Sequence, residues 1–179
     1  MTEINTKDEL TIALKDSSQR AHAWFSSMPA DDFFKRTGDV WSASDNLDHM
    51  IRSVKPISKA LKFPTITLQA MFGKPSSPSR SYEKICEIYR VAISKGAQAS
   101  GSFLPEQVAL QVDAENKKSA LLEKWSKTSD LLVENLEKWN DDSLDQYQLP
   151  HPILGKLTIR EMLFFTIYHN LRHASQEGD

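Results

Sequence analysis

The sequence predicts an all-α protein, an antiparallel four-helix bundle with a long crossover that contains short helices. Three observations predict this class. Outside the joints that carry proline and glycine, nearly every long segment repeats its apolar residues with helical rather than alternating spacing. No Asn-Gly or Asp-Gly turn lies between strand-like runs, so we expect no hairpin. Four of the segments are long helix candidates, and one connection between them is long, which is a known bundle plan.

The first helix is expected from about Lys7 to Met28, where an apolar face precedes the break at Pro29. A second helix follows a loop. Ser42, with Asp45 three residues further on, has the spacing of a capping box and predicts where this helix begins. Its apolar positions continue to Leu61.

The crossover is expected over residues 63–103, which several prolines and Gly73 interrupt. Within it, an apolar stripe over residues 82–94 predicts a short helix. Residues 106–139 contain no proline or glycine and repeat apolar residues with helical spacing, so they predict the third long helix. Residues 146–156 contain two prolines and a glycine, and we interpret them as a turn.

The final helix begins with a second capping signal, Thr158 and Glu161. Its apolar residues point in almost every direction around the axis, which is typical of a buried helix. His169 and His173 are four residues apart on it and therefore lie one above the other. Neutral imidazoles at this spacing can share a zinc, nickel, copper or iron ion. The alternative is a solvated pair near a frayed helix end.

A zinc-peptidase mechanism is not expected, because Asn170 follows His169 where that motif has a glutamate. A third ligand must come from another segment. His49 in the second helix lies roughly 130 degrees from the apolar stripe of that helix, so periodicity alone favours a surface position. His22 and His151 are the alternatives, and for each of them a solvated side chain is the simpler interpretation.

The totals exclude several classes of protein. A chain of 179 residues fits a single domain over residues 1–179. Its 22 basic and 24 acidic residues are spread along the chain, so no nucleic acid partner and no anionic membrane partner are expected. Cys86 is the only cysteine, which excludes an intramolecular disulfide and agrees with a reducing, cytoplasmic location. The start is polar, and no apolar run reaches the roughly 18 residues of a spanning helix.

Two segments of the chain resemble the DinB-like, or YfiT-like, metal-binding bundle proteins. Residues 151–161 and the two histidines that follow are similar to the family's HP-x-x-G-x-LT turn and H-x-x-x-H helix. Residues 41–49 are similar to its W-[ST]-x-x-[DE]-x-L-x-H opening. The resemblance implies a four-helix bundle in which His49, His169 and His173 bind a divalent metal ion, zinc or nickel first among the candidates, near one end. It also makes a homodimer an expectation.

Family members with established roles include metal-dependent thiol transferases and isomerases that use small thiols, and many others are described as metal-dependent hydrolases. Three protein nitrogens leave at least one position of an ion open, which is the arrangement of a catalytic site. We therefore expect an enzyme of transferase or hydrolase type that acts on a small-molecule substrate, with a low-molecular-weight thiol as a candidate cofactor. Catalytic residues are not assigned. The alternative is a non-catalytic bundle braced by the metal, acting as a stress-related homodimer.

Three further residues are candidates around such a site, each with a simpler interpretation. Asp45 lies one turn before His49 and either orients its ring or only caps the helix. Arg172 either binds an anionic substrate group or pairs with an acidic residue. Trp41 either stacks on a substrate or packs. Cys86 is expected to be an inert apolar filler.

Overall fold

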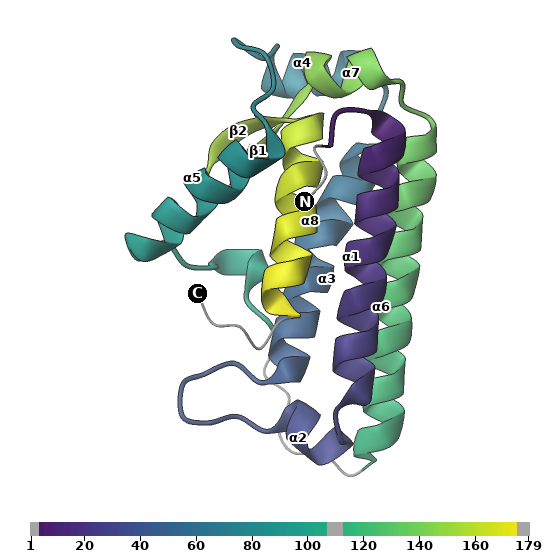
Figure 1. The fold of residues 1–179 in the computed structure, drawn as a ribbon, viewed down its shortest axis with the longest axis vertical. Coiled ribbons are helices and arrows are strands. Elements are labelled where there is room, and N and C mark those ends of the chain that lie inside the picture. The colour runs from purple at the N-terminus through teal and green to yellow at the C-terminus, as the bar shows by residue number, and fades with distance from the viewer. Residues whose placement is uncertain (1–3, 107–112, 175–179) are drawn as a thin grey trace.

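Four long helices lie side by side in the computed structural model of the chain, which describes residues 4–106 and 113–174 (Figure 1). They are α1 (Lys7–Ser27), α3 (Ala43–Ala60), α6 (Ala114–Glu137) and α8 (Ile159–His173). The shorter elements are α2 (Ala30–Phe34), α4 (Thr65–Phe72), α5 (Tyr82–Ser94), the 3-10 helix η1 (Gly101–Phe103), α7 (Asp141–Gln146), β1 (Gln148–His151) and β2 (Gly155–Thr158). The expected all-α bundle is confirmed.

Contacts between helix ends give the direction of each helix. Lys118 near the start of α6 donates to carbonyls at the end of α1, Ser26 and Met28, so these two helices are antiparallel. His49 in the first half of α3 meets His173 at the end of α8, so this pair is antiparallel as well. The long crossover returns the chain to the end of the bundle at which α3 begins (Figure 1). As a result α3 and α6 run in the same direction.

Local sequence explains where two of the long helices begin. The Ser42 hydroxyl accepts from the backbone N–H of Asp45, whose carboxylate accepts from the N–H of Ser42. Thr158 and Glu161 form the same reciprocal pair at α8. Each box satisfies backbone donors that a helix start would leave unpaired. Both predicted starts are therefore confirmed.

The crossover contains short helices, as expected, and α5 covers the predicted residues 82–94. The third long helix was expected over residues 106–139. The structure places α6 at Ala114–Glu137, and residues 107–112 lie outside the described part of the chain. Asp113, the residue before α6, has a left-handed backbone with φ of 74°.

The interpretation of residues 146–156 as a turn without strands was wrong. Residues 148–151 and 155–158 pair as an antiparallel hairpin, with His151 opposite Gly155. Gly155 has a φ of 75°, a conformation that glycine adopts without strain at the end of a three-residue hairpin loop. Pro150 is tolerated because a two-stranded ribbon has free edges that need no N–H donor.

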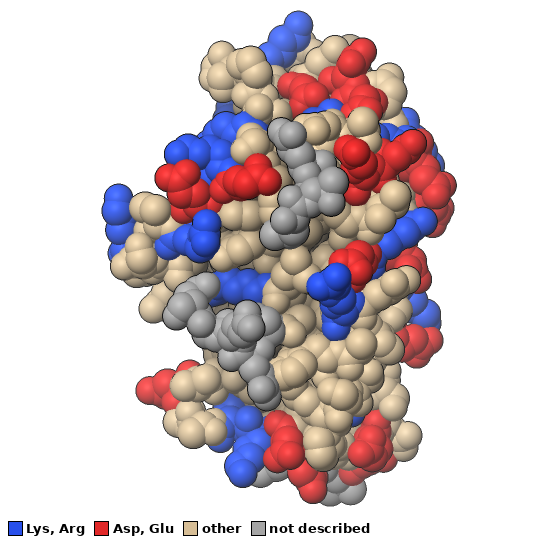
Figure 2. Space-filling model, viewed as in Figure 1, with Lys and Arg blue, Asp and Glu red and all other residues tan. Residues whose placement is uncertain are grey.

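The core explains why α8 is apolar all round. Helices α1, α3 and α5 and the hairpin all contact α8, so most of its residues are buried. The largest fully buried side chains are Trp125, Phe25, Phe33 and Phe164. On the face drawn in Figure 2, acidic and basic residues are interspersed. None of the described helices is both long and apolar enough to cross a membrane.

Candidate metal centre

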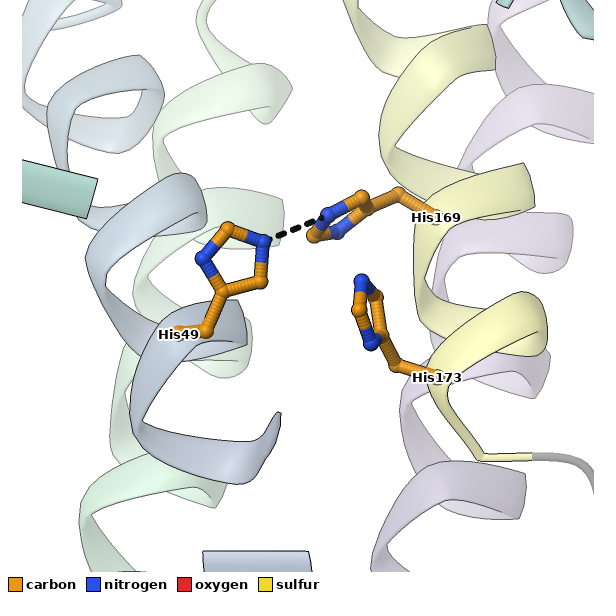
Figure 3. A group of neighbouring side chains, drawn as sticks. All are labelled: His49, His169 and His173. Carbon is orange, nitrogen blue, oxygen red and sulfur yellow. Dashed lines mark hydrogen bonds between the residues drawn. The ribbon is translucent and has the colours of Figure 1, made fainter. Parts of the chain in front are cut away.

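Helix α8 brings His169 and His173 to the same side of the bundle, one turn apart (Figure 3). His169 is 2% exposed and His173 is half-buried near the end of the helix. Their ring centroids are 4.4 Å apart. The pair therefore lies inside the molecule, and the alternative of a solvated pair at a frayed end is not what the structure shows.

His49 on α3 faces this pair and is only 6% exposed (Figure 3). The surface position that periodicity favoured was wrong for a physical reason. Two segments outside α3 cover the face of the helix that carries His49. The crossover places Phe103 against its ring, and the Trp41 ring lies 5.1 Å from it between centroids. Periodicity considers the residues of one helix only, so it cannot predict that Phe103 and Trp41 from other segments bury His49.

The three imidazoles converge. One ring nitrogen from each lies within 4.8 Å of the other two, and Nε2 of His49 is 3.0 Å from Nε2 of His169. Zinc binds imidazole nitrogen at about 2.0–2.1 Å, so nitrogens that share an ion lie at most about 4.2 Å apart. The observed spacing is close to that range. The donor set, three neutral nitrogens, suits zinc and nickel.

Hydrogen bonds fix which nitrogen of His49 points inward. Its Nδ1–H donates to the carbonyl oxygen of Phe103 at 2.7 Å, and a carbonyl can only accept. The proton is therefore on Nδ1, and Nε2 presents a lone pair to the cluster. A backbone acceptor of this kind is a common outer partner of a metal-binding histidine.

The side chain of Asn46 determines which ring nitrogen of His173 carries the proton. Asn46 Nδ2 donates to the carbonyl oxygen of Ser42 at 2.9 Å, which identifies Oδ1 as its free acceptor. Nδ1 of His173 lies 2.7 Å from that oxygen and therefore donates to it. Asn46 thus links the start of α3 to the end of α8 and leaves Nε2 of His173 unprotonated.

Burial keeps these rings neutral. It lowers the pKa of His49 below its ordinary value and, aided by the charges of His173 and His49, lowers the pKa of His169 well below it. Burial also lowers the pKa of His173 to about 3. Neutral imidazole is the form that has a lone pair for a metal ion. The site therefore favours the protonation state that metal binding needs.

Replacing Asn46 by alanine is expected to weaken zinc binding about 10- to 100-fold, the usual effect of losing an outer partner of a ligand. Without Oδ1, nothing selects the Nδ1–H tautomer of His173 or fixes the orientation of its ring. Titration of metal-free protein with zinc against a competing chelator measures the change.

The matched control is Asn116→Ala, which removes an exposed asparagine on α6 far from the histidines in sequence. It should bind zinc like the wild type. If Asn46→Ala retains both helical content and wild-type affinity, Asn46 does not orient the site.

A cavity of about 630 Å³ lies against the three histidines. Its walls include Trp41, Tyr89, Phe103 and Phe165 together with several aliphatic residues, so they are largely apolar. The guanidinium of Arg172 also borders it and lies 6.0 Å from the centre of the Tyr89 ring. This volume is in the range of small-molecule sites. Within residues 4–106 and 113–174, no fourth histidine, cysteine or carboxylate joins the cluster.

The structure separates the roles of the other candidates. Asp45 caps α3 and pairs with Arg36 at 2.6 Å, so the capping interpretation holds and Phe103 takes the orienting role at His49. Trp41 packs on His49 and also borders the cavity. Cys86 is buried on α5, and burial raises the pKa of its thiol, as an inert filler requires.

The alternative histidines do not join the cluster. His22 is half-buried on α1. His151 was expected to be solvated, which was wrong: it is 7% exposed, since its ring packs against Phe165 at 4.3 Å between centroids. Sequence reasoning also missed Asn46, although it lies three residues before His49 and shares a helix face with it. The Phe103 carbonyl is a backbone group and carries no sequence signal.

Comparison with known proteins gives one family. The model of the DinB superfamily matches residues 13–176, nearly the whole chain. No curated protein and no solved structure matches the chain. The matched range includes all three histidines. It also includes the segments of Trp41 and Phe103, which cover His49.

Proposed function

Because the chain belongs to the DinB superfamily, we propose that it binds one divalent ion, zinc or nickel, through His49, His169 and His173, and acts as a metal-dependent enzyme on a small molecule. The observation that carries this proposal is the position of the cluster. Three neutral imidazoles, two of them oriented by hydrogen bonds, lie at the wall of a cavity large enough for a substrate. A site whose only role was to brace α3 against α8 would need no such cavity.

A divalent ion at three imidazoles supplies a Lewis acid with an open position, at which a water or thiol ligand ionises near neutral pH. The chain itself does the positioning. The Phe103 carbonyl and the Asn46 amide fix two of the imidazoles in the tautomer that presents Nε2. The apolar walls of the cavity would pack against the apolar part of a substrate.

Charge near the cluster favours an anionic ligand. Burial lowers the pKa of each of the three histidines most, and the positive charge of Arg172, which borders the cavity, makes the smallest contribution in the same direction. A thiolate or a carboxylate placed there is stabilised by the same charge. This is the support for a thiol transferase or hydrolase type of reaction.

The test asks whether a thiol can reach and bind a metal ion at the site. We expect protein loaded with cobalt(II) to gain a sulfur-to-metal charge-transfer band in the near ultraviolet when 2-mercaptoethanol is added, because a coordinated thiol deprotonates. His169→Ala should not gain the band. Cobalt bound without any spectral response to thiol would indicate a closed site and favour the metal-braced bundle over the enzyme.

A further inference from the structure

His151 is the buried titratable group beside the cavity that the three-histidine site does not use. It ends β1, and its Nδ1 accepts two backbone N–H groups of the hairpin loop, from Ile153 at 3.2 Å and from Leu154 at 3.0 Å. A nitrogen that accepts cannot carry a proton. The ring is therefore the neutral Nε2–H tautomer, and the loop itself fixes it.

The Nε2–H donor has no hydrogen-bond partner among the described residues. The residue is 7% exposed and borders the cavity, and its Nε2 is not among the fully buried polar atoms that lack a partner, so an acceptor in the cavity can reach this donor. Burial lowers the pKa of His151 to about 4, which agrees with a neutral ring. Its protonated Nε2 is also unsuited to bind a metal.

The surroundings of His151 are apolar and reach the metal centre. The edge of its ring meets Phe165, whose own ring lies 5.0 Å from that of His169 between centroids. Met162 and Ile153 also line the cavity. A ligand beside the His151 ring and Phe165 therefore meets apolar side chains and the Nε2–H donor.

We propose that His151 is a substrate-binding donor: its Nε2–H receives an acceptor oxygen, such as a carbonyl, of an otherwise apolar substrate. This deepens the proposed function, on which it rests in taking the cavity as the substrate site. A neutral donor recognises an uncharged carbonyl, whereas the guanidinium of Arg172 suits an anion. The substrate class is thus an apolar molecule with a carbonyl group near the reacting end.

His151→Asn separates this role from the support of the hairpin. The asparagine Oδ1 occupies nearly the position of Nδ1 and can accept from Ile153 and Leu154, but nothing replaces the Nε2–H. The thermal midpoint of this variant should stay close to that of the wild type.

Two probes with one skeleton measure the donor. The ketone 4-phenyl-2-butanone has an acceptor oxygen, and n-butylbenzene does not. The wild type should prefer the ketone, and His151→Asn should reduce the ratio of the two dissociation constants about fivefold, the value of one neutral hydrogen bond. Chemical-shift titration of ¹⁵N-labelled protein gives both constants. An unchanged ratio would overturn the proposal.

The wild type alone gives a second test that does not depend on the variant. The ¹⁵N signal of His151 Nε2 should shift with the ketone and not with butylbenzene. Equal shifts with both probes, or binding of neither, would overturn the proposal. Metal content measured on the same samples separates the two ideas. Bound zinc without ketone preference refutes only this inference, whereas ketone preference without metal refutes the proposed function and leaves the donor role supported.

Discussion

Replacing His169 by alanine is expected to lower the affinity of the chain for zinc or nickel by at least about a hundredfold, more than the loss of an outer partner. His169 is the most buried of the three histidines and lies beside both of the others. Two imidazoles on different helices cannot bind an ion as three do. Competition with a metal chelator measures the affinity, and circular dichroism checks the fold.

His49→Ala and His173→Ala should behave in the same way, because each removes one of the three proposed ligands. The matched control is His22→Ala, a histidine on α1 outside the cluster, which should bind metal like the wild type. Metal-free His169→Ala should also keep its fold, although the loss of a buried ring lowers its stability, so circular dichroism is recorded on the metal-free variant. Wild-type affinity in His169→Ala would remove this residue from the site.

Replacing Glu161 by alanine is expected to destabilise the fold by about 1–3 kcal/mol, the cost of leaving the backbone N–H groups of Arg80 and Thr158 without their acceptor. Glu161 is 3% exposed and accepts two hydrogen bonds from the Arg80 guanidinium, at 2.7 and 3.0 Å. It also accepts from the backbone N–H of Arg80 and completes the capping box of α8. Denaturant unfolding gives the difference.

The same contact predicts a pH dependence. Burial acts to raise the pKa of Glu161, but hydrogen bonds from Arg80 and Thr158 outweigh it and lower the pKa below its ordinary value. A carboxyl group with a lowered folded pKa stabilises the fold above its unfolded pKa of about 4.3, and this part is lost as the pH falls through the folded pKa. The unfolding free energy of Glu161→Ala should therefore fall less in acid than that of the wild type.

Glu134→Ala is the control for both measurements, because Glu134 is exposed on α6. Its effect should stay within about 0.5 kcal/mol, and its pH profile should follow the wild type. A loss of similar size in both variants would mean that the Arg80 pair has no special weight.

Much of the fold could be predicted because its signals are local. Capping boxes at Ser42 and Thr158 depend on residues three apart, and the starts of α3 and α8 agree with them. The all-round apolar pattern of α8 gave its burial for the same reason. Positions set by distant segments could not be predicted in this way.

The hairpin and His49 illustrate the second case. Strand pairing of residues 148–158 depends on a backbone ladder and on the imidazole of His151 at the end of β1, which accepts from the loop, not on a turn dipeptide. His49 is buried because Phe103, 54 positions away along the chain, covers its face of α3. The family resemblance, not periodicity, led to the correct neighbours of His49.

At the site, helix geometry alone predicted that His169 and His173 form a pair, and the structure places them together. Their partners were harder to predict. Asn46 was not predicted as a partner, because the neighbouring Asp45 is acidic and an acidic residue is the more familiar partner of a ligating histidine. His151 was predicted to be solvated, because nothing near it in the sequence indicates that its ring packs against Phe165.

The central claim is that His49, His169 and His173 together bind one divalent ion, and metal content tests it most directly. Protein made without a histidine tag is supplied with zinc, nickel, iron or manganese, dialysed, and measured by elemental mass spectrometry. We predict about one zinc or nickel per chain in the wild type and a large loss in each of the three alanine variants. A wild type that retains no metal under these conditions would contradict the account.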